Sequence, residues 1–277
     1  MDAERSVFHN LAFRQSEDLK ELSLPKEGLA PSIETLKEGL VLGDWLNEMF
    51  QENRAREACS LLLREYPHFE QQFGPHHYHC LNYKICILKA AVQAGEVLSD
   101  SRIFNSVQEA ALDENRGMGP LAINLLTVSM RYGAEFHRYK PTYAAIAFEC
   151  AEAAYRNLYL VPQDSPLRSS VQEQLIFSAH RLKGHSDLVM SRNFEVMARS
   201  AYEVLGSECS DSVKIAYAEV LIARFDKESA LLNAKEHLLP EERDLMQDKL
   251  DKRIITALAV VNPHLSHAEE LFTEMEL

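Results

Sequence analysis

The feature of this chain that most constrains its fold is a repeated alternation of amphipathic stretches and short breaks. Each predicted break follows one amphipathic stretch and precedes the next: Asn53, Gly95, Gly133, Gly184 and Asp226. The breaks are separated by 42, 38, 51 and 42 residues. A near-constant period of this length is typical of stacked helical hairpins, in which each repeat buries its apolar face against its neighbours.

The apolar residues before these breaks share one helical face. Two stretches carry apolar residues at steps of four, three and four: Leu81, Ile85, Leu88 and Val92, and Leu121, Leu125, Val128 and Tyr132. Two later stretches repeat these steps with one polar residue each, Ser178 in the first and Arg224 in the second. Such steps line one side of an α-helix, and the alternation typical of strands is almost absent. The sequence therefore predicts an all-α protein.

The breaks divide the chain into about five helical hairpins and a closing helix. The hairpins are predicted at 32–66, 78–114, 118–158, 166–205 and 210–239. The closing helix is predicted at about 241–261, with Glu241 and Glu242 in its first turn, where carboxylates interact favourably with the helix dipole. All ten prolines fall where an amphipathic stretch is expected to begin or end, because proline is costly inside a helix.

The two ends of the chain differ from the repeats. Residues 1–24 read as a lone amphipathic helix joined by a loop around Pro25–Pro31, so we divide the chain into an N-terminal helix and linker (1–30), a helical-repeat domain (31–261) and an acidic tail (262–277). We interpret the first helix as a cap over the open core edge of the array. The alternative is that it folds into the binding groove and blocks it. The tail carries Leu271, Phe272 and Met275 among its acidic residues.

Composition narrows the class of ligand and the compartment. The formal net charge of −13 argues against nucleic acid as the main ligand, because phosphate binding needs a cationic surface. The five cysteines lack CxxC spacing and lie mostly in apolar helical stretches, which is typical of small buried side chains in a reducing compartment. The N-terminus has no apolar signal region, and no window approaches the ~20 apolar residues that span a bilayer. We expect a soluble cytoplasmic or nuclear protein without membrane contact.

One stretch resembles a known repeat family. Phe73-Gly74-Pro75-His76-His77, followed by Leu81-Asn82 and a helix ending at Gly95, resembles tetratricopeptide repeats of the kinesin-light-chain type, in which Leu-Gly and His-Pro precede the first helix and Glu-Ala opens the second. The stretch 205–211 looks like another copy, and Arg56-Glu57-Ala58 resembles the Glu-Ala step. The resemblance covers roughly residues 40–239. It implies a right-handed α-solenoid whose first helices line a concave groove for a peptide or partner helix.

Polar residues on the predicted first helices are the candidates for contact with such a partner. They are Asn82, Lys89, Gln93, Asn124, Arg131, Gln174 and Arg181. Amide side chains pair with a peptide backbone, and arginines bind carboxylates through two parallel hydrogen bonds. The alternative at each position is a solvated face without a partner.

Sequence signatures of catalysis are almost entirely missing. The chain contains no GxGxxG, GxxxxGK[ST], GxSxG or HExxH motif, so we expect no nucleotide cofactor and no hydrolase or zincin chemistry. The one cluster of reactive side chains is His76, His77 and His79 with Cys80. Three interpretations stay open for it: a solvated loop, a metal site completed by a distant residue, and a pH-sensitive contact. We favour the solvated loop and expect no bound metal.

These observations predict a non-enzymatic adaptor or scaffold that binds a protein or peptide in a groove. One alternative is a helical regulator that holds a small molecule or signalling peptide in an enclosed cavity. Another is an all-α enzyme that uses the His76–Cys80 region. A third is a subunit of a large assembly, which would expose one long apolar flank.

Overall fold

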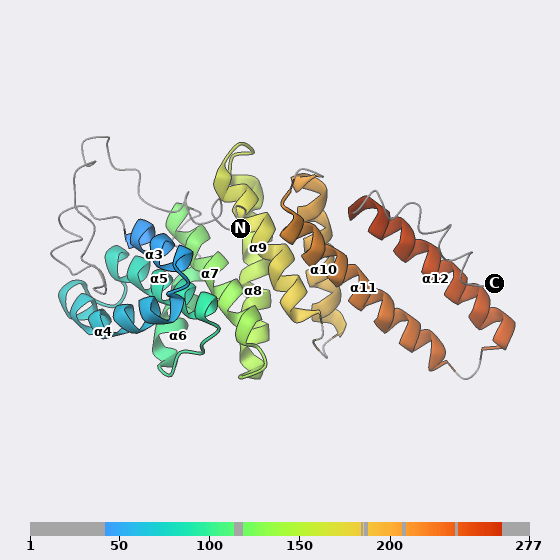
Figure 1. Ribbon diagram of the computed structural model, residues 1–277, viewed down its shortest axis with the longest axis horizontal. Helices are drawn as coiled ribbons and strands as arrows, with labels where there is room; N and C mark the ends of the chain where they lie inside the picture. The colour runs from blue at the N-terminus through green and yellow to red at the C-terminus, as the bar shows by residue number, and fades with distance from the viewer. Residues whose placement is uncertain are drawn as a thin grey trace. The chain divides into compact units, whose positions relative to one another are not determined.

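The fold of the described chain is helical throughout. The computed structural model describes residues 42–113, 119–183, 185, 188–206, 209–235 and 238–261. These residues contain α-helices and one 3₁₀ turn but no strand (Figure 1). The all-α prediction is therefore confirmed. The predicted N-terminal helix, its linker, the break at Gly184 and the acidic tail lie outside the described residues.

The described helices belong to two compact units, and the boundary between Gln174 and Leu175 lies within α9 (Pro166–Leu182). The first unit contains the N-terminal part of α9 and these elements: α3 (Leu42–Gln51), α4 (Ala55–Phe73), α5 (Tyr78–Ala94), α6 (Ser101–Ala111), α7 (Pro120–Phe136), α8 (Pro141–Asn157) and the 3₁₀ turn η3 (Leu158–Leu160). The second unit contains the C-terminal part of α9, α10 (Leu188–Leu205), α11 (Asp211–Asn233) and α12 (Pro240–Val261). None of the described helices is long and apolar enough to cross a bilayer.

Several helix ends lie where the sequence predicts them. Asn53 has a φ of 58° between α3 and α4, and Gly95 has a φ of 68° at the end of α5. Such left-handed conformations end helices and are favourable mainly for glycine and asparagine. Proline opens α7, α8, α9 and α12, where its missing N–H has no helical partner to lose.

Aromatic side chains form much of the core of the first unit. The Phe69 and Tyr83 rings stack with centroids 4.0 Å apart, and Phe104 lies 4.6 Å from Tyr132. The Tyr132 hydroxyl accepts a hydrogen bond of 2.9 Å from the backbone N–H of Leu98, which ties the loop after α5 to α7. These contacts join α4 to α5 and α6 to α7.

The predicted break at Gly133 is wrong. Gly133 lies inside α7, which continues to Phe136, and the connection to α8 follows it. A Cβ on Gly133 would lie 2.6 Å from the carbonyl oxygen of Tyr143 and 3.1 Å from the Cβ of Ala147. Gly133 therefore allows α7 and α8 to pack closely, because it has no side chain at their contact. The glycine that suggested a turn in the sequence marks a contact between two helices instead.

The predicted end of a helix at Pro67 is also wrong. Pro67 lies inside α4, which continues to Phe73, so the first hairpin does not end at residue 66. Proline inside a helix costs about 3 kcal/mol. Tyr66 and Phe69, on either side of it, are buried, and this burial offsets much of that cost.

The fifth predicted hairpin is a single helix. Asp226 lies within α11, which runs without interruption from Asp211 to Asn233, and the hairpin partner of α11 is α12 (Figure 1). Arg224 and Glu228 form an ion pair of 2.7 Å one turn apart, which supports the helix at the expected break. The predicted closing helix at 241–261 is confirmed as α12, with Glu241 and Glu242 in its first turn.

All five cysteines are thiols in the described part of the chain. Cys59, Cys80 and Cys150 are buried, as predicted, whereas Cys86 and Cys209 are partly exposed. Burial raises the pKa of Cys59 to about 11 and that of Cys150 to about 12. The neutral thiol is thus the form present at neutral pH.

Candidate functional site

The partner-contact residues predicted from the sequence lie on three helices. Asn82, Lys89 and Gln93 are on α5, Asn124 and Arg131 on α7, and Gln174 and Arg181 on α9. Gln93 and Arg181 are exposed, and Asn82, Lys89, Arg131 and Gln174 are partly exposed. Asn124 is only 7% exposed, which leaves little of its side chain for a partner. None of the seven residues lines either of the two cavities formed by the helices of the second unit.

The histidine cluster forms the start of α5. The Nδ1 of His77 accepts a hydrogen bond of 3.3 Å from the backbone N–H of His79, which caps the helix. The Phe73 ring lies 5.3 Å from the His77 ring and 5.2 Å from the His79 ring. Within the described ranges, no group of three or more His, Cys, Asp or Glu side chains is placed to hold a metal ion. The geometry gives His77 a role in capping, and gives His77 and His79 a role in aromatic packing.

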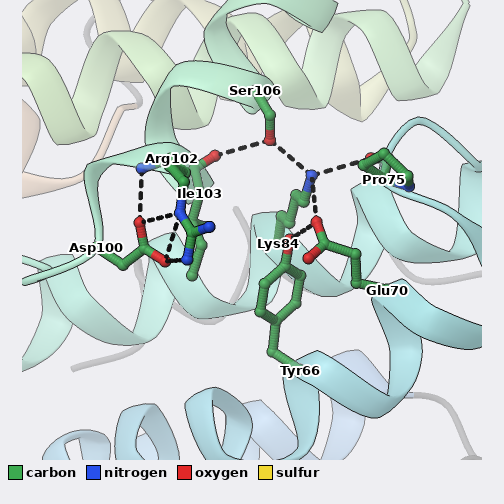
Figure 2. A network of polar contacts seen from close by, with 8 residues as sticks. All are labelled: Tyr66, Glu70, Pro75, Lys84, Asp100, Arg102, Ile103 and Ser106. Atoms are coloured by element: carbon green, nitrogen blue, oxygen red, sulfur yellow. Dashed lines mark hydrogen bonds and ion pairs between the residues drawn. The ribbon is translucent and has the colours of Figure 1, made fainter.

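A buried lysine, which the sequence interpretation missed, holds together the turn between α4 and α5. Lys84 is 1% exposed, and Figure 2 shows its ammonium group at the centre of a polar network. The Nζ donates to the carbonyl oxygen of Pro75 at 2.9 Å and to the Oγ of Ser106 at 2.6 Å, and lies 4.0 Å from the Oε1 of Glu70. The Tyr66 hydroxyl donates to the same Glu70 oxygen.

This network gives the ammonium group of Lys84 a partner for each of its donors, so the group has no free donor for a ligand or a reaction. An ammonium group has three donors, and three acceptors surround it here. Burial lowers the pKa of Lys84, but each nearby group already acts as a partner. Lys84 therefore has a structural role: it joins the α4–α5 turn to α6 through Ser106, whose hydroxyl donates to the Ile103 carbonyl at 3.1 Å.

A cavity of about 260 Å³ lies in the second unit where α10 and α11 meet the end of α9. Its walls are apolar at Ala179, Val220 and Leu231. Its charged lining residues are Lys183, Arg192, Glu195, Arg224, Lys227 and Glu228. A cavity with an apolar wall and converging polar groups is typical of a binding site.

A second cavity, of about 410 Å³, adjoins the first along α11. Glu228 and Leu231 line both cavities, so together they form one site, which we call the α11 trough. The second cavity lies between α11 and α12, and its lining is mainly apolar with two lysines: Leu232, Met246, Leu250, Lys235 and Lys249.

Ion pairs hold several of the side chains that line the α11 trough in place. Glu195, only 3% exposed, binds Arg224 from α11 and Arg199 from its own helix, and Arg224 also donates to Glu228 at 2.7 Å. Lys227 donates to the His185 carbonyl and to the Ser191 hydroxyl, both at 3.1 Å, and burial lowers its pKa. These contacts hold the basic side chains in place before a ligand arrives, which favours binding.

Glu219 binds Lys183, one of the cations that line the trough. Its Oε2 accepts from Lys183 and lies 2.8 Å from the Nε2 of His180. These two hydrogen bonds lower the pKa of Glu219, so it is a carboxylate at neutral pH. Glu219 thus fixes Lys183, which lines the first cavity.

The trough carries a local excess of positive charge in an acidic chain. Six cations and two carboxylates line it, an excess of four positive charges, whereas the whole chain has a net charge of −13. Arg192 and Lys249 are exposed and form no ion pair with another described residue. The sequence contained one signal of this site: Arg224 occupies a slot that is apolar in the other repeats, as Val92 and Tyr132 show.

Comparison with known proteins identified no matching family model, no matching curated protein and no matching solved structure. The resemblance to tetratricopeptide repeats therefore stays a prediction.

Proposed function

We propose that this protein is a non-enzymatic adaptor that binds a peptide or a partner helix in the α11 trough. The observation that carries the proposal is the trough itself: two adjoining cavities along one helix, apolar on their walls and lined by six cations. A linear site of this kind suits an extended or helical segment with alternating apolar and charged side chains. The excess of positive charge would steer and orient an oppositely charged partner.

The pairing of helices supports a tetratricopeptide-like solenoid as the scaffold for this function. Three pairs of successive helices pack closely, α4 against α5, α7 against α8 and α11 against α12, and the connections within these pairs are short (Figure 1). We propose that these pairs are the repeats of a right-handed array. Such arrays hold a binding surface rigid, because each pair is supported by its neighbours.

The chemistry of the trough supports binding without catalysis. Its carboxylates are engaged by arginines, and the Ser191 hydroxyl accepts from Lys227. Lys227 also donates to the His185 carbonyl, so these contacts use its ammonium form as a donor. We propose that the protein binds its partner in the cytosol or nucleus, because free cysteines such as those of this chain stay reduced there.

The proposal is tested by affinity capture from a cell lysate with three charge-reversal variants. Arg192→Glu/Lys249→Glu changes the trough, and Arg131→Glu/Arg181→Glu changes the groove predicted from the sequence. Arg138→Glu/Lys140→Glu adds the same negative charge on an exposed part of the first unit and serves as the control. We expect a partner that is retained by the control and by the groove variant but lost by the trough variant, and that binds the purified protein with the same pattern.

Two results would contradict the proposal. If the trough variant retains its partner and the groove variant loses it, the site lies on the predicted first helices instead. If the purified protein binds no captured partner directly, the adaptor function itself is wrong.

A further inference from the structure

The α11 trough has the chemistry of a site for an acidic segment with apolar side chains. Arg192 and Lys249 point to carboxylates as ligands of the trough, because they form no ion pair with another described residue and because lysine and arginine bind carboxylates with charge-assisted hydrogen bonds. The second cavity offers Met246 and Leu250, which suit an apolar side chain. Acidic and apolar side chains close together in sequence are therefore expected in the occupant.

The sequence that follows α12 has this composition. Residues 262–277, which lie outside the described residues, contain glutamates at positions 269, 270, 274 and 276 and neither lysine nor arginine. Leu271, Phe272 and Met275 lie between these glutamates. The charge of these four glutamates is opposite in sign to the excess of cations that line the trough.

The segment is long enough to reach the trough within one molecule. The distance along α12 from Val261 back to Leu250 is about 16 Å at 1.5 Å per residue. The chain from 262 to 277 spans up to about 50 Å when extended and about 24 Å as a helix. Either form covers the distance to the second cavity.

We propose that the α11 trough binds the acidic segment 262–277 of the same chain. This inference rests on the proposed function, because the segment then competes with the partner for the site. A tethered segment has an effective concentration of about 1 mM, so even a weak interaction occupies the site for much of the time. A partner must displace the segment, which makes its apparent affinity lower than its intrinsic affinity.

The test measures the binding of a fluorescently labelled peptide with the sequence of residues 262–277 to two full-length chains. One is the unmodified chain. The other carries glutamine in place of Glu269, Glu270, Glu274 and Glu276, which removes the charge of the tethered segment and opens the trough. If the peptide binds the open chain with a Kd of about 10 μM, we expect it to bind the unmodified chain up to about 100-fold more weakly.

The site is then identified in the open chain. Arg192→Glu/Lys249→Glu is expected to weaken peptide binding about tenfold, and the control Arg138→Glu/Lys140→Glu to change it less than twofold. A peptide with Phe272→Ala should also bind more weakly, because it loses the apolar contact. Equal affinity for the unmodified and open chains, or a trough variant with unchanged affinity, would overturn the inference.

The same variants separate this inference from the proposed function. If a partner depends on the trough and the peptide does not, the inference fails and the proposed function stands. If the peptide depends on the trough and the open chain binds no partner, the inference stands and the proposed function fails.

Discussion

Replacing Gly133 by alanine should destabilise the protein, although the same change inside a helix normally stabilises it. Alanine is favoured over glycine in a helix interior by about 1 kcal/mol. At position 133 the new Cβ would lie 2.6 Å from the Tyr143 carbonyl oxygen, 3.1 Å from the Ala147 Cβ and 3.2 Å from the Ala147 nitrogen. Two of these three atoms belong to the backbone of α8, so relief requires α7 and α8 to move apart.

The net effect follows from these two contributions. Overpacking of a close contact costs typically 1–3 kcal/mol and occasionally more. After the gain in helix propensity is subtracted, we expect Gly133→Ala to lower the free energy of unfolding by up to about 2 kcal/mol. Urea denaturation followed by circular dichroism at 222 nm measures this change.

Gly119→Ala is the matched control. Gly119 has an ordinary φ of −76° at the start of α7, and a Cβ there would contact no atom within 4 Å. We expect its effect to stay within about 0.5 kcal/mol, because a weaker cap is offset by a less flexible unfolded chain. A stabilisation of about 1 kcal/mol by Gly133→Ala would refute the reasoning, since it would mean that α7 and α8 are not in close contact at this point.

Three further predictions concern buried polar groups. Lys84→Ala should lower the free energy of unfolding by about 2–4 kcal/mol in urea denaturation, because it leaves a cavity and removes the donor to Pro75 and Ser106; an unchanged stability would contradict the structural role. Burial raises the pKa of Glu173 to about 7. The folded protein should therefore lose stability as the pH rises from about 4.5 through 7, and Glu173→Gln should raise stability at pH 8 by up to about 3 kcal/mol and flatten this decline. Iodoacetamide at pH 8 should leave Cys59 and Cys150 unmodified until the protein unfolds, as mass spectrometry of digests would show; rapid labelling of both in the folded protein would contradict their burial.

The periodicity of apolar residues was sufficient to predict the helices, because a buried face repeats along a helix whatever its neighbours are. The helix predicted to begin at residue 78 and to end at Gly95 is α5, and α9 and α10 together begin and end where the hairpin predicted at 166–205 does. The predicted helix ends were wrong where a glycine or a proline, which commonly ends a helix, lies inside one instead. Gly133 and Pro67 both looked like helix ends, and only the contacts of α7 with α8 and the burial around α4 distinguish these uses.

The binding site was harder to predict from the sequence, because its residues come from four successive helices and come together only when these helices pack. Lys183, Arg192, Arg224 and Lys249 lie on or next to four different helices, and each reads as a solvated charge in isolation. Nothing in the sequence distinguishes Glu195 from the other acidic residues, yet it is buried and binds two arginines. The only indication of the site in the sequence was Arg224, a cation at a position that is apolar in the other stretches.

The most direct test of the α11 trough is site-specific photo-crosslinking. Leu231 lines both cavities and is 52% exposed, and Tyr139 is 68% exposed in the first unit. A photoreactive amino acid at either position of the full-length chain would report which surface a captured partner touches. We predict strong cross-linking from position 231 and little from position 139. Strong cross-linking from position 139 with none from position 231 would contradict the account.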